Sequence, residues 1–158
     1  RRALQAVARA ADGRGPATAL TPKVLAHFRV ARPSGLIPEV YDRPLRHHAL
    51  AQVARAVQQA RDEGDFVATQ ILEQAAHELL SAARSVTEQL QMRDESFEFV
   101  LAGGVFGGVP WLTQELTRRL PEVAPRATVR RLEVEPAMGA VRLAAAEARG
   151  GARIPAYV

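Results

Sequence analysis

The sequence contains no cysteine among its 158 residues. Without thiols the chain cannot form a disulfide framework, a thiolate zinc site or a cysteine nucleophile. A chain of this kind fits a reducing compartment, and we therefore expect a cytoplasmic location. Aromatic residues make up only 5% of the chain, so it also lacks the interleaved aromatic platform on which single-stranded nucleic acid stacks.

Lysine is almost absent as well, since Lys23 is the only one among 21 basic residues. Against 17 acidic residues the basic side chains give a net charge of +4. The arginines are scattered along the chain, which is typical of a solvated surface. We therefore expect no nucleic-acid partner.

Long hydrophobic runs are missing too. The longest apolar window, Phe97 to Leu112, is interrupted by four glycines and a proline. It is shorter than the roughly 20 residues that a membrane span needs, and no signal-peptide pattern is present, so we expect no membrane association. The chain opens on Arg1-Arg2-Ala3-Leu4, without methionine and already in helical phase, which suggests a piece of a longer protein. Hydrophobic residues make up 47% of the chain, enough for one folded domain with a core.

The stretch that organises the rest of the chain begins inside this apolar window. Phe97 to Leu101 predicts a strand buried on both faces, because aromatic and β-branched residues dominate it. The glycine pairs at 103–104 and 107–108 then let a ligand or a second backbone approach closely. The sequence thus places an unusually accessible piece of backbone directly after a buried strand.

A helix is predicted to follow, with Pro110 in its first position and Pro121 at its end. Leu112, Leu116 and Leu120 form its apolar face. Free backbone N–H groups and the positive end of the helix dipole would converge on the glycines, which predicts a nucleotide-contacting corner. A tight turn that needs only a positive φ explains the glycine pair equally well, and both interpretations stay open at this point.

Helical spacing of apolar residues predicts five helices before this corner. We expect them over residues 1–11, from an N-cap at Thr21 to Phe28, from a cap at Ser34 to Tyr41, from the turn Asp42-Arg43-Pro44 to about Gly64, and from a cap at Asp65 to Leu90. The expected buried faces are Leu4, Val7, Ala8 and Ala11 in the first helix, Leu50, Val53, Ala54 and Val57 in the fourth, and Val67, Ile71, Ala75, Leu79, Val86 and Leu90 in the fifth.

A second strand is predicted after the corner, over Thr128 to Val134, followed by a helix with Met138, Val141, Ala144, Ala145 and Ala148 on one face. Two strands joined by a helix form a right-handed crossover and are therefore parallel. Two short strands are too few for a stable sheet, so we expect further strands upstream of Arg1.

Familiar catalytic patterns are absent. His27, His47, His48 and His77 have no metal-ligand spacing, and the sequence has neither a Gly-x-Ser-x-Gly elbow nor the lysine of a phosphate loop. The glycines also fail the Gly-x-Gly-x-x-Gly spacing of dinucleotide folds. We therefore assign no catalytic residue and no metal ligand in this chain.

The order and spacing of several segments resemble a known family. They are Phe-Val-Leu-Ala-Gly-Gly at 99–104, Glu-Pro-Ala-Met-Gly-Ala-Val-Arg-Leu-Ala at 135–144, Asp-Gly-Arg-Gly-Pro at 12–16, His-Phe-Arg-Val at 27–30 with Gly-Leu-Ile at 35–37, and Gly-Asp at 64–65. Together they look like the carboxyl-terminal part of the N-acetylglucosamine kinase and benzoyl-CoA reductase activator type ATPase family, within the actin-like sugar kinase superfamily. The resemblance covers nearly the whole chain.

The resemblance implies an α/β fold, the carboxyl-terminal portion of a ribonuclease-H-like, actin-like ATPase domain. It is helix-rich, with two parallel strands and an inserted helical subregion at 1–64, and with residues 65–158 as the unit on the nucleotide side. It also implies that Gly103 and Gly104, with Val105 beside them, contact adenosine, and that the loop at Ala17 flanks the base. The phosphate-binding hairpins, the general-base aspartate and most sugar contacts would belong to upstream sequence.

By this resemblance the protein is an ATP-dependent, Mg²⁺-requiring kinase of N-acetylglucosamine or a related amino sugar. A homodimer is one possible assembly of it. Two other functions stay open. One is an ATPase that activates an iron–sulfur dehydratase or reductase, against which the lack of cysteine argues mildly. The other is a non-catalytic sugar-sensing module of the same fold.

Overall fold

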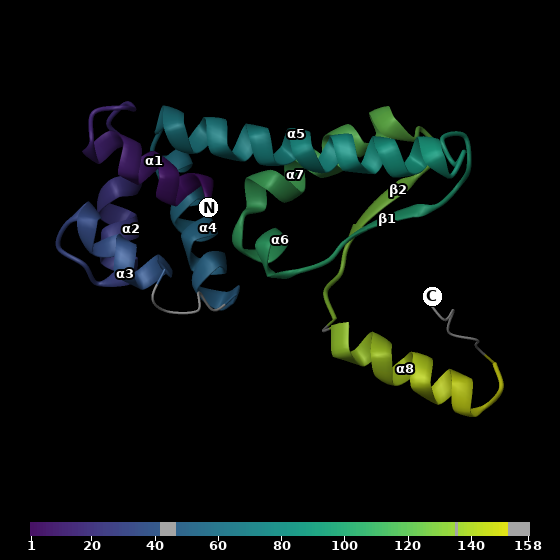
Figure 1. Ribbon diagram of the computed structural model, residues 1–158. Helices are drawn as coiled ribbons and strands as arrows, with labels where there is room; N and C mark the ends of the chain where they lie inside the picture. Colours follow the sequence, from purple (N-terminus) through teal and green to yellow (C-terminus); the bar gives the residue numbers. More distant parts are fainter. Residues whose placement is uncertain (42–46, 135, 152–158) are drawn as a thin grey trace.

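The computed structural model describes residues 1–41, 47–134 and 136–151 and shows a helix-rich α/β chain (Figure 1). Its elements are α1 (Arg2–Ala11), α2 (Leu20–Phe28), the 3-10 helix η1 (Pro33–Gly35), α3 (Leu36–Tyr41), α4 (His47–Asp62), α5 (Phe66–Gln89), β1 (Glu98–Leu101), α6 (Gly104–Gly108), α7 (Pro110–Val123), β2 (Thr128–Arg131) and α8 (Pro136–Ala148). The turn predicted at Asp42-Arg43-Pro44 lies outside the described residues. In the part of the chain that is described, no helix is long and apolar enough to cross a membrane.

The helix starts are only partly as predicted. Asp65 caps α5, because its carboxylate accepts a hydrogen bond from the amide of Ala68 at 2.7 Å. The cap predicted at Thr21 is wrong, since α2 begins at Leu20 and the amide of Leu20 donates to the hydroxyl of Thr18 instead. The cap predicted at Ser34 is also wrong, because Ser34 lies inside η1 and α3 begins after it.

One hydrophobic core joins the helices to the sheet. Its most deeply buried large side chains are Val7 of α1, Leu20 and Val24 of α2, Val109, and Leu116 of α7. In Figure 1 the long helix α5 runs beside α7, with α1, α2 and α4 gathered at one end. This core contains residues from both sides of position 64 and does not mark a boundary there. The predicted division into 1–64 and 65–158 stays a prediction.

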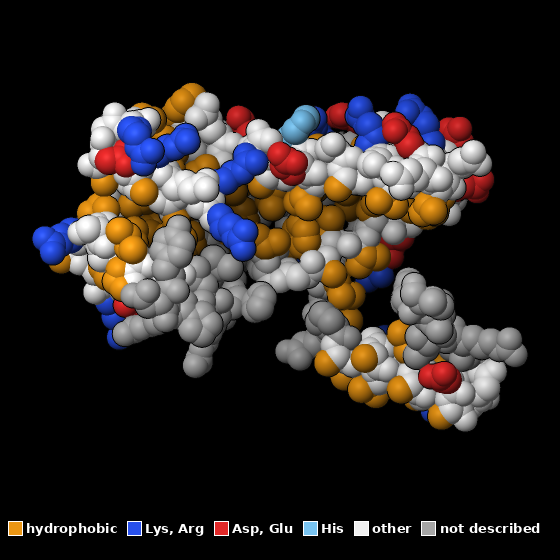
Figure 2. Space-filling model, in the orientation of Figure 1, with side chains coloured by type: hydrophobic (Ala, Val, Ile, Leu, Met, Phe, Trp, Pro, Cys, Tyr) orange, Lys and Arg blue, Asp and Glu red, His pale blue; other side chains and the backbone are white. Residues whose placement is uncertain are grey.

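The buried face of α5 is only partly the predicted one. Val67, Ile71 and Ala75 are half-buried and pack against the core as predicted. Leu79, Val86 and Leu90 are 40%, 56% and 61% exposed, whereas the residues buried on α5 are Ala68, Leu72, Ala76, Leu80 and Thr87. The most deeply buried stripe therefore lies one position further along the helix than the predicted stripe. Two of its members are alanines, which let neighbouring helices approach closely. Figure 2 shows hydrophobic side chains at the surface along the lower side of α5 in this view.

A smaller error of the same kind affects α1. Val7 is buried and Leu4 is half-buried as predicted, but Ala8 and Ala11 are exposed and Ala3 is buried instead. The contacts of α1 with α2 and α5 decide this face.

The two strands are parallel, as predicted, with Glu98 opposite Thr128 and Leu101 opposite Arg131. Burial of β1 on both faces is wrong for this chain. Leu101 is buried on the helix side, but Val100 is 44% exposed on the other face. The two side chains of β1 on that second face, Glu98 and Val100, are both exposed. The right-handed sense of the crossover stays a prediction.

Strand β2 is shorter than predicted and ends at Arg131 instead of Val134. The amide of Leu132 still donates to the carbonyl of Leu101 at 2.9 Å. The chain of β1 turns away after Leu101, so residues beyond 132 have no partner strand there.

Helix α7 continues past Pro121 to Val123, against the prediction that the proline ends it. The proline removes one hydrogen bond, but one more turn buries Val123 and Ala124 in the core, and the amide of Ala124 bonds to the carbonyl of Leu120. Helix α8 forms as predicted, yet Met138 and Val141 on its apolar face are 48% and 60% exposed. Figure 1 shows α8 standing apart from the other helices.

Candidate nucleotide-binding corner

The glycine pair that follows β1 is an exposed, open turn. Gly103 has φ +116°, a conformation that favours glycine, whereas φ is not positive at Gly104. A Cβ atom added to Gly103 or Gly104 would meet no other atom within 4 Å. Val105, the next residue, is 36% exposed. The backbone here is therefore reachable from solvent, and the turn itself requires glycine only at position 103.

A short helix that the sequence did not predict, α6, separates this turn from α7. Pro110 is the first residue of α7, as predicted. The amide of Trp111 donates to the side-chain oxygen of Gln58 at 3.1 Å, and the amide of Leu112 to the carbonyl of Val109. The expected convergence of the α7 dipole and its free amides on Gly103 is therefore wrong, because α6 intervenes and neighbouring residues use these amides.

Two arginines flank α6. The Cγ and Nε atoms of Arg55, on α4, lie 3.2 Å from the position of a Cβ on Gly108. A guanidinium nitrogen of Arg131, at the end of β2, lies 4.0 Å from the corresponding position on Gly107. Because residues 107 and 108 are glycines, no side chain separates the backbone of α6 from these two arginine side chains. Sequence reasoning missed both arginines, because only the packing of α4 on α6 and the position of the Arg131 side chain beside Gly107 distinguish them from the other scattered arginines.

A polar cluster around the buried side chain of Gln58 connects α4 to the start of α7. Gln58 is 9% exposed, and its amide nitrogen donates to the carboxylate of Asp62 at 2.8 Å while its oxygen caps Trp111. The guanidinium of Arg61 lies 4.6 Å from the centre of the Trp111 ring, a cation–π contact. This cluster fixes the α6–α7 corner against α4, and no sequence pattern indicated it.

Arg130, which precedes Arg131 on β2, forms an ion pair with Glu98 on the opposite face of the sheet. Arg130 donates to both carboxylate oxygens of Glu98, at 3.0 and 2.8 Å. The hydrogen bond from Arg130 lowers the pKa of Glu98, and the same bond raises the pKa of Arg130. The two adjacent arginines therefore differ, because Arg130 is paired and Arg131 has no carboxylate partner among the described residues.

Ala17 is exposed on the loop between α1 and α2. The following residues of that loop are held at the start of α5, where the Asp65 carboxylate accepts from the Thr18 hydroxyl at 3.0 Å and from the Ala19 amide at 2.7 Å. In Figure 1 this loop and the β1–α6 turn lie on different sides of α4. The described contacts do not bring Ala17 together with Gly103, and its place beside the base stays a prediction.

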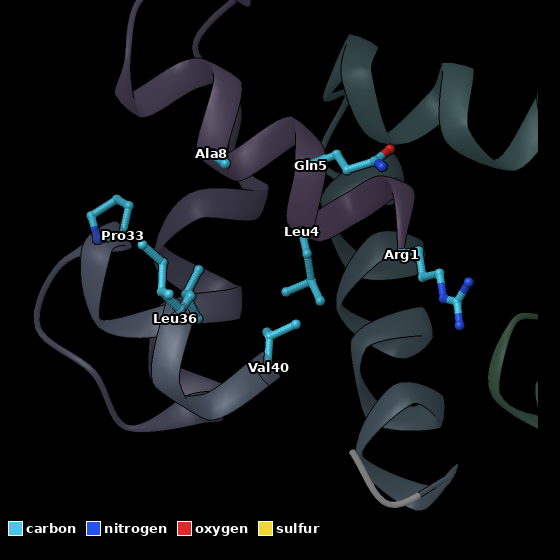
Figure 3. A pocket seen from close by; sticks show the side chains of 8 residues that line it. Arg1, Leu4, Gln5, Ala8, Pro33, Leu36 and Val40 are labelled. Carbon is cyan, nitrogen blue, oxygen red and sulfur yellow. The ribbon is translucent and has the colours of Figure 1, made fainter. Parts of the chain in front are cut away.

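A separate groove of about 520 Å³ lies between α1 and the η1–α3 segment (Figure 3). Arg1, Leu4, Gln5, Ala8, Pro33, Leu36, Ile37 and Val40 line it. A sugar needs several hydrogen-bonding groups around its ring, and only Arg1 and Gln5 offer polar side chains here. We assign no ligand to this groove.

Metal-binding geometry does not occur in the described part of the chain, where no group of three or more His, Asp or Glu side chains lies together. His27 and His77 are described, whereas the side chains of His47 and His48 lie outside the described set.

Comparison with known proteins places these observations in a family context. Residues 1–144 match the model of the BadF/BadG/BcrA/BcrD ATPase family. The N-acetylmuramic acid/N-acetylglucosamine kinase of Clostridium acetobutylicum is 29% identical over 146 residues, which is 92% of this chain and 48% of that protein. The N-acetyl-D-glucosamine kinase of Dictyostelium discoideum is 29% identical over 143 residues, covering 89% of this chain and 45% of that protein. The chain spans about half the length of the curated relatives it matches.

Proposed function

The chain belongs to the BadF/BadG/BcrA/BcrD ATPase family, and we propose from this that the protein containing it is an ATP-dependent kinase of N-acetylglucosamine or a related amino sugar. The observation that carries the proposal is the match of nine-tenths of the chain to two proteins named as N-acetylglucosamine kinases. The recognition made from the sequence is confirmed at the level of the family.

Within this proposal the chain supplies the adenosine side of the nucleotide site. Adenine and ribose lie against the backbone of Gly103 and Gly104, with Val105 beside them. Support comes from the exposure of this turn and from the open space around both glycines. Ala17 is proposed to flank the base from the α1–α2 loop.

The fold proposed for the complete protein is ribonuclease-H-like, with residues 1–64 as an inserted helical region. The relatives are about twice as long as the matched region, and the phosphate-binding hairpins, the general base and most sugar contacts are proposed to lie outside these 158 residues. Mg²⁺ bound to ATP would neutralise charge on the transferring phosphoryl group. No three His, Asp or Glu side chains lie together among the described residues, and no metal ligand is assigned here.

The direct test is an assay of the complete protein with ATP, Mg²⁺ and N-acetylglucosamine, measuring both ADP release and the sugar phosphate. We expect sugar-dependent turnover on the order of 1 per second or faster, as for an ordinary enzyme. Assays with N-acetylmuramic acid and with glucose, under the same conditions, would report the preference for the acetamido group.

The same assay separates the alternatives. An activating ATPase would release ADP at a rate that does not depend on the sugar. A sugar-sensing module would bind the sugar without forming sugar phosphate. Either result would overturn the kinase proposal.

A further inference from the structure

We propose that Arg131 and Arg55 bind the phosphate groups of the nucleotide whose adenosine lies at Gly103 and Gly104. This assignment rests on the proposed function and deepens it, because it adds two residues of this chain to the nucleotide site. Its basis is the position of both side chains against the same short helix, α6, immediately after the glycine turn.

The strand register brings Arg131 close to the turn. Arg131 is the partner of Leu101 in the parallel pair, and Leu101 precedes Gly103 by two residues. From there the side chain reaches across α6 to Gly107, where its terminal nitrogen lies 4.0 Å from the position of a Cβ. Arg55 reaches the adjacent Gly108 from α4. A helix of five residues is only about 7.5 Å long, so both arginines lie within a short distance of the glycine turn.

The charges around α6 are not compensated within the described part of the chain. Both arginines are exposed, and neither has a carboxylate partner among the described residues. Two carboxylates on neighbouring elements bind other side chains: Glu98 pairs with Arg130, and Asp62 contacts Gln58 and Arg61. Two guanidinium groups that have no carboxylate partner among the described residues, beside an open backbone turn, match a ligand that is neutral at one end and polyanionic at the other.

The test is a comparison of Arg131→Gln with Arg130→Gln in the complete protein, by calorimetric titration with ATP, ADP and adenosine. The two positions are adjacent arginines on one strand, both exposed, but only Arg131 lies against α6. We expect Arg131→Gln to weaken ATP and ADP binding about tenfold and to leave adenosine binding unchanged, since a charged hydrogen bond to phosphate is lost. Arg130→Gln should leave all three affinities at the wild-type level.

Further variants complete the comparison. Arg55→Gln should show the same pattern as Arg131→Gln. Arg131→Lys, which keeps the charge and loses the planar fork, should give a smaller loss. Circular dichroism and a thermal melt of each variant would establish that it folds, which is expected because the substituted side chains are exposed.

Each outcome is decisive. Equal ATP affinities of Arg131→Gln and Arg130→Gln would overturn this inference and leave the proposed function intact. A parallel loss of adenosine and ATP binding in Arg131→Gln would show a contact with the base or ribose, and the phosphate assignment would be wrong. If the wild-type protein binds neither ATP nor adenosine, the proposed function fails and this inference fails with it.

Discussion

Two turns of this molecule place a positive-φ glycine immediately before a helix, and they are completed in different ways. Gly64, with φ +88°, precedes the cap of α5, and Gly103, with φ +116°, precedes α6. At both positions an added Cβ would meet no atom within 4 Å. The backbone requirement is the same, so the difference between the two turns lies in what surrounds them.

At the first turn the chain satisfies its own polar groups. The Asp65 carboxylate accepts from the Ala68 amide, the Ala19 amide and the Thr18 hydroxyl, which ties α5 to the start of α2. At the second turn no side chain caps α6. The first turn therefore serves the fold, and the second leaves exposed backbone that a ligand can contact.

The largest expected effect on stability is at the first turn, at Gly64 and Asp65. Replacing Asp65 with alanine removes three hydrogen bonds, one of which is the cap of α5, and we expect a loss of about 2 to 3 kcal/mol in the free energy of unfolding. Urea denaturation of both proteins would measure it. Asp12→Ala is the matched control, because the exposed Asp12 carboxylate bonds to the amide and guanidinium of Arg14, two residues away, and the denaturation midpoint of this variant should not move. An equal effect of the two variants would mean that Asp65 is an ordinary surface carboxylate.

The next effect tests whether both turns need glycine. Gly64→Ala and Gly103→Ala each force a side chain into a positive φ, and we expect each to cost about 1 to 2 kcal/mol. Gly104→Ala should cost much less, because φ is not positive there and the space is open. Thermal melts of the three variants would establish the order. A cost at Gly104 that equals the cost at Gly103 would contradict the assignment of strain to position 103 alone.

A third change acts on the ligand and leaves the fold intact. Gly104→Val places a bulky side chain where adenosine is proposed to lie, and we expect ATP affinity to fall about fivefold, or roughly 1 kcal/mol, with sugar affinity unchanged. Separate calorimetric titrations with ATP and with the sugar would measure this, and Gly104→Ala should give a smaller loss. Unchanged ATP affinity in the folded valine variant would remove the adenosine assignment.

The smallest expected effect is the pH dependence of the stability that Asp65 contributes at the first turn. Burial alone would raise the pKa of Asp65, but hydrogen bonds from the amides of Ala68 and Ala19 and from the hydroxyl of Thr18 outweigh it, so the pKa lies below its ordinary value of 3.8. A lowered pKa in the folded state means that the charged carboxylate stabilises the protein above pH 3.8 and that this contribution is lost as the pH falls through the lowered pKa.

Asp65→Asn isolates this contribution, since asparagine also caps helices but does not titrate. We expect the stability difference between wild type and Asp65→Asn to be constant from pH 7 to about pH 5 and to shrink below pH 4. Denaturation curves of both proteins at a series of pH values would measure it. A difference that stays constant down to pH 3 would show that the Asp65 carboxylate is not stabilised in its charged form.

Much of the local structure could be predicted from the sequence. The helices at the start of the chain, the Asp65 cap, Pro110 as the first residue of α7 and the parallel pairing of two strands all follow from local spacing and chain connectivity. The need for a positive φ at the glycine pair was also predicted as one of two interpretations. These features depend on a few neighbouring residues, whose conformational preferences are contained in the sequence.

The sequence could not supply which faces are buried or how the corner is arranged. Helix α5 has apolar residues on two adjacent stripes, and only the position of α7 and α4 decides that Leu72 and Leu80 are buried and Leu79 is not. Likewise, burial of Val123 outweighs the bond that Pro121 removes.

The sequence by itself determined which segments form most of the helices and both strands, and through the family resemblance it indicated an ATP-binding protein. Only the tertiary structure decided that α6 separates the glycine turn from α7, that Gln58 takes an amide of that helix, and that Arg131 rather than Arg130 lies beside the turn. The physical reason is that capping and turn preferences act within a few residues, whereas these contacts join residues more than 20 positions apart and depend on how the elements pack.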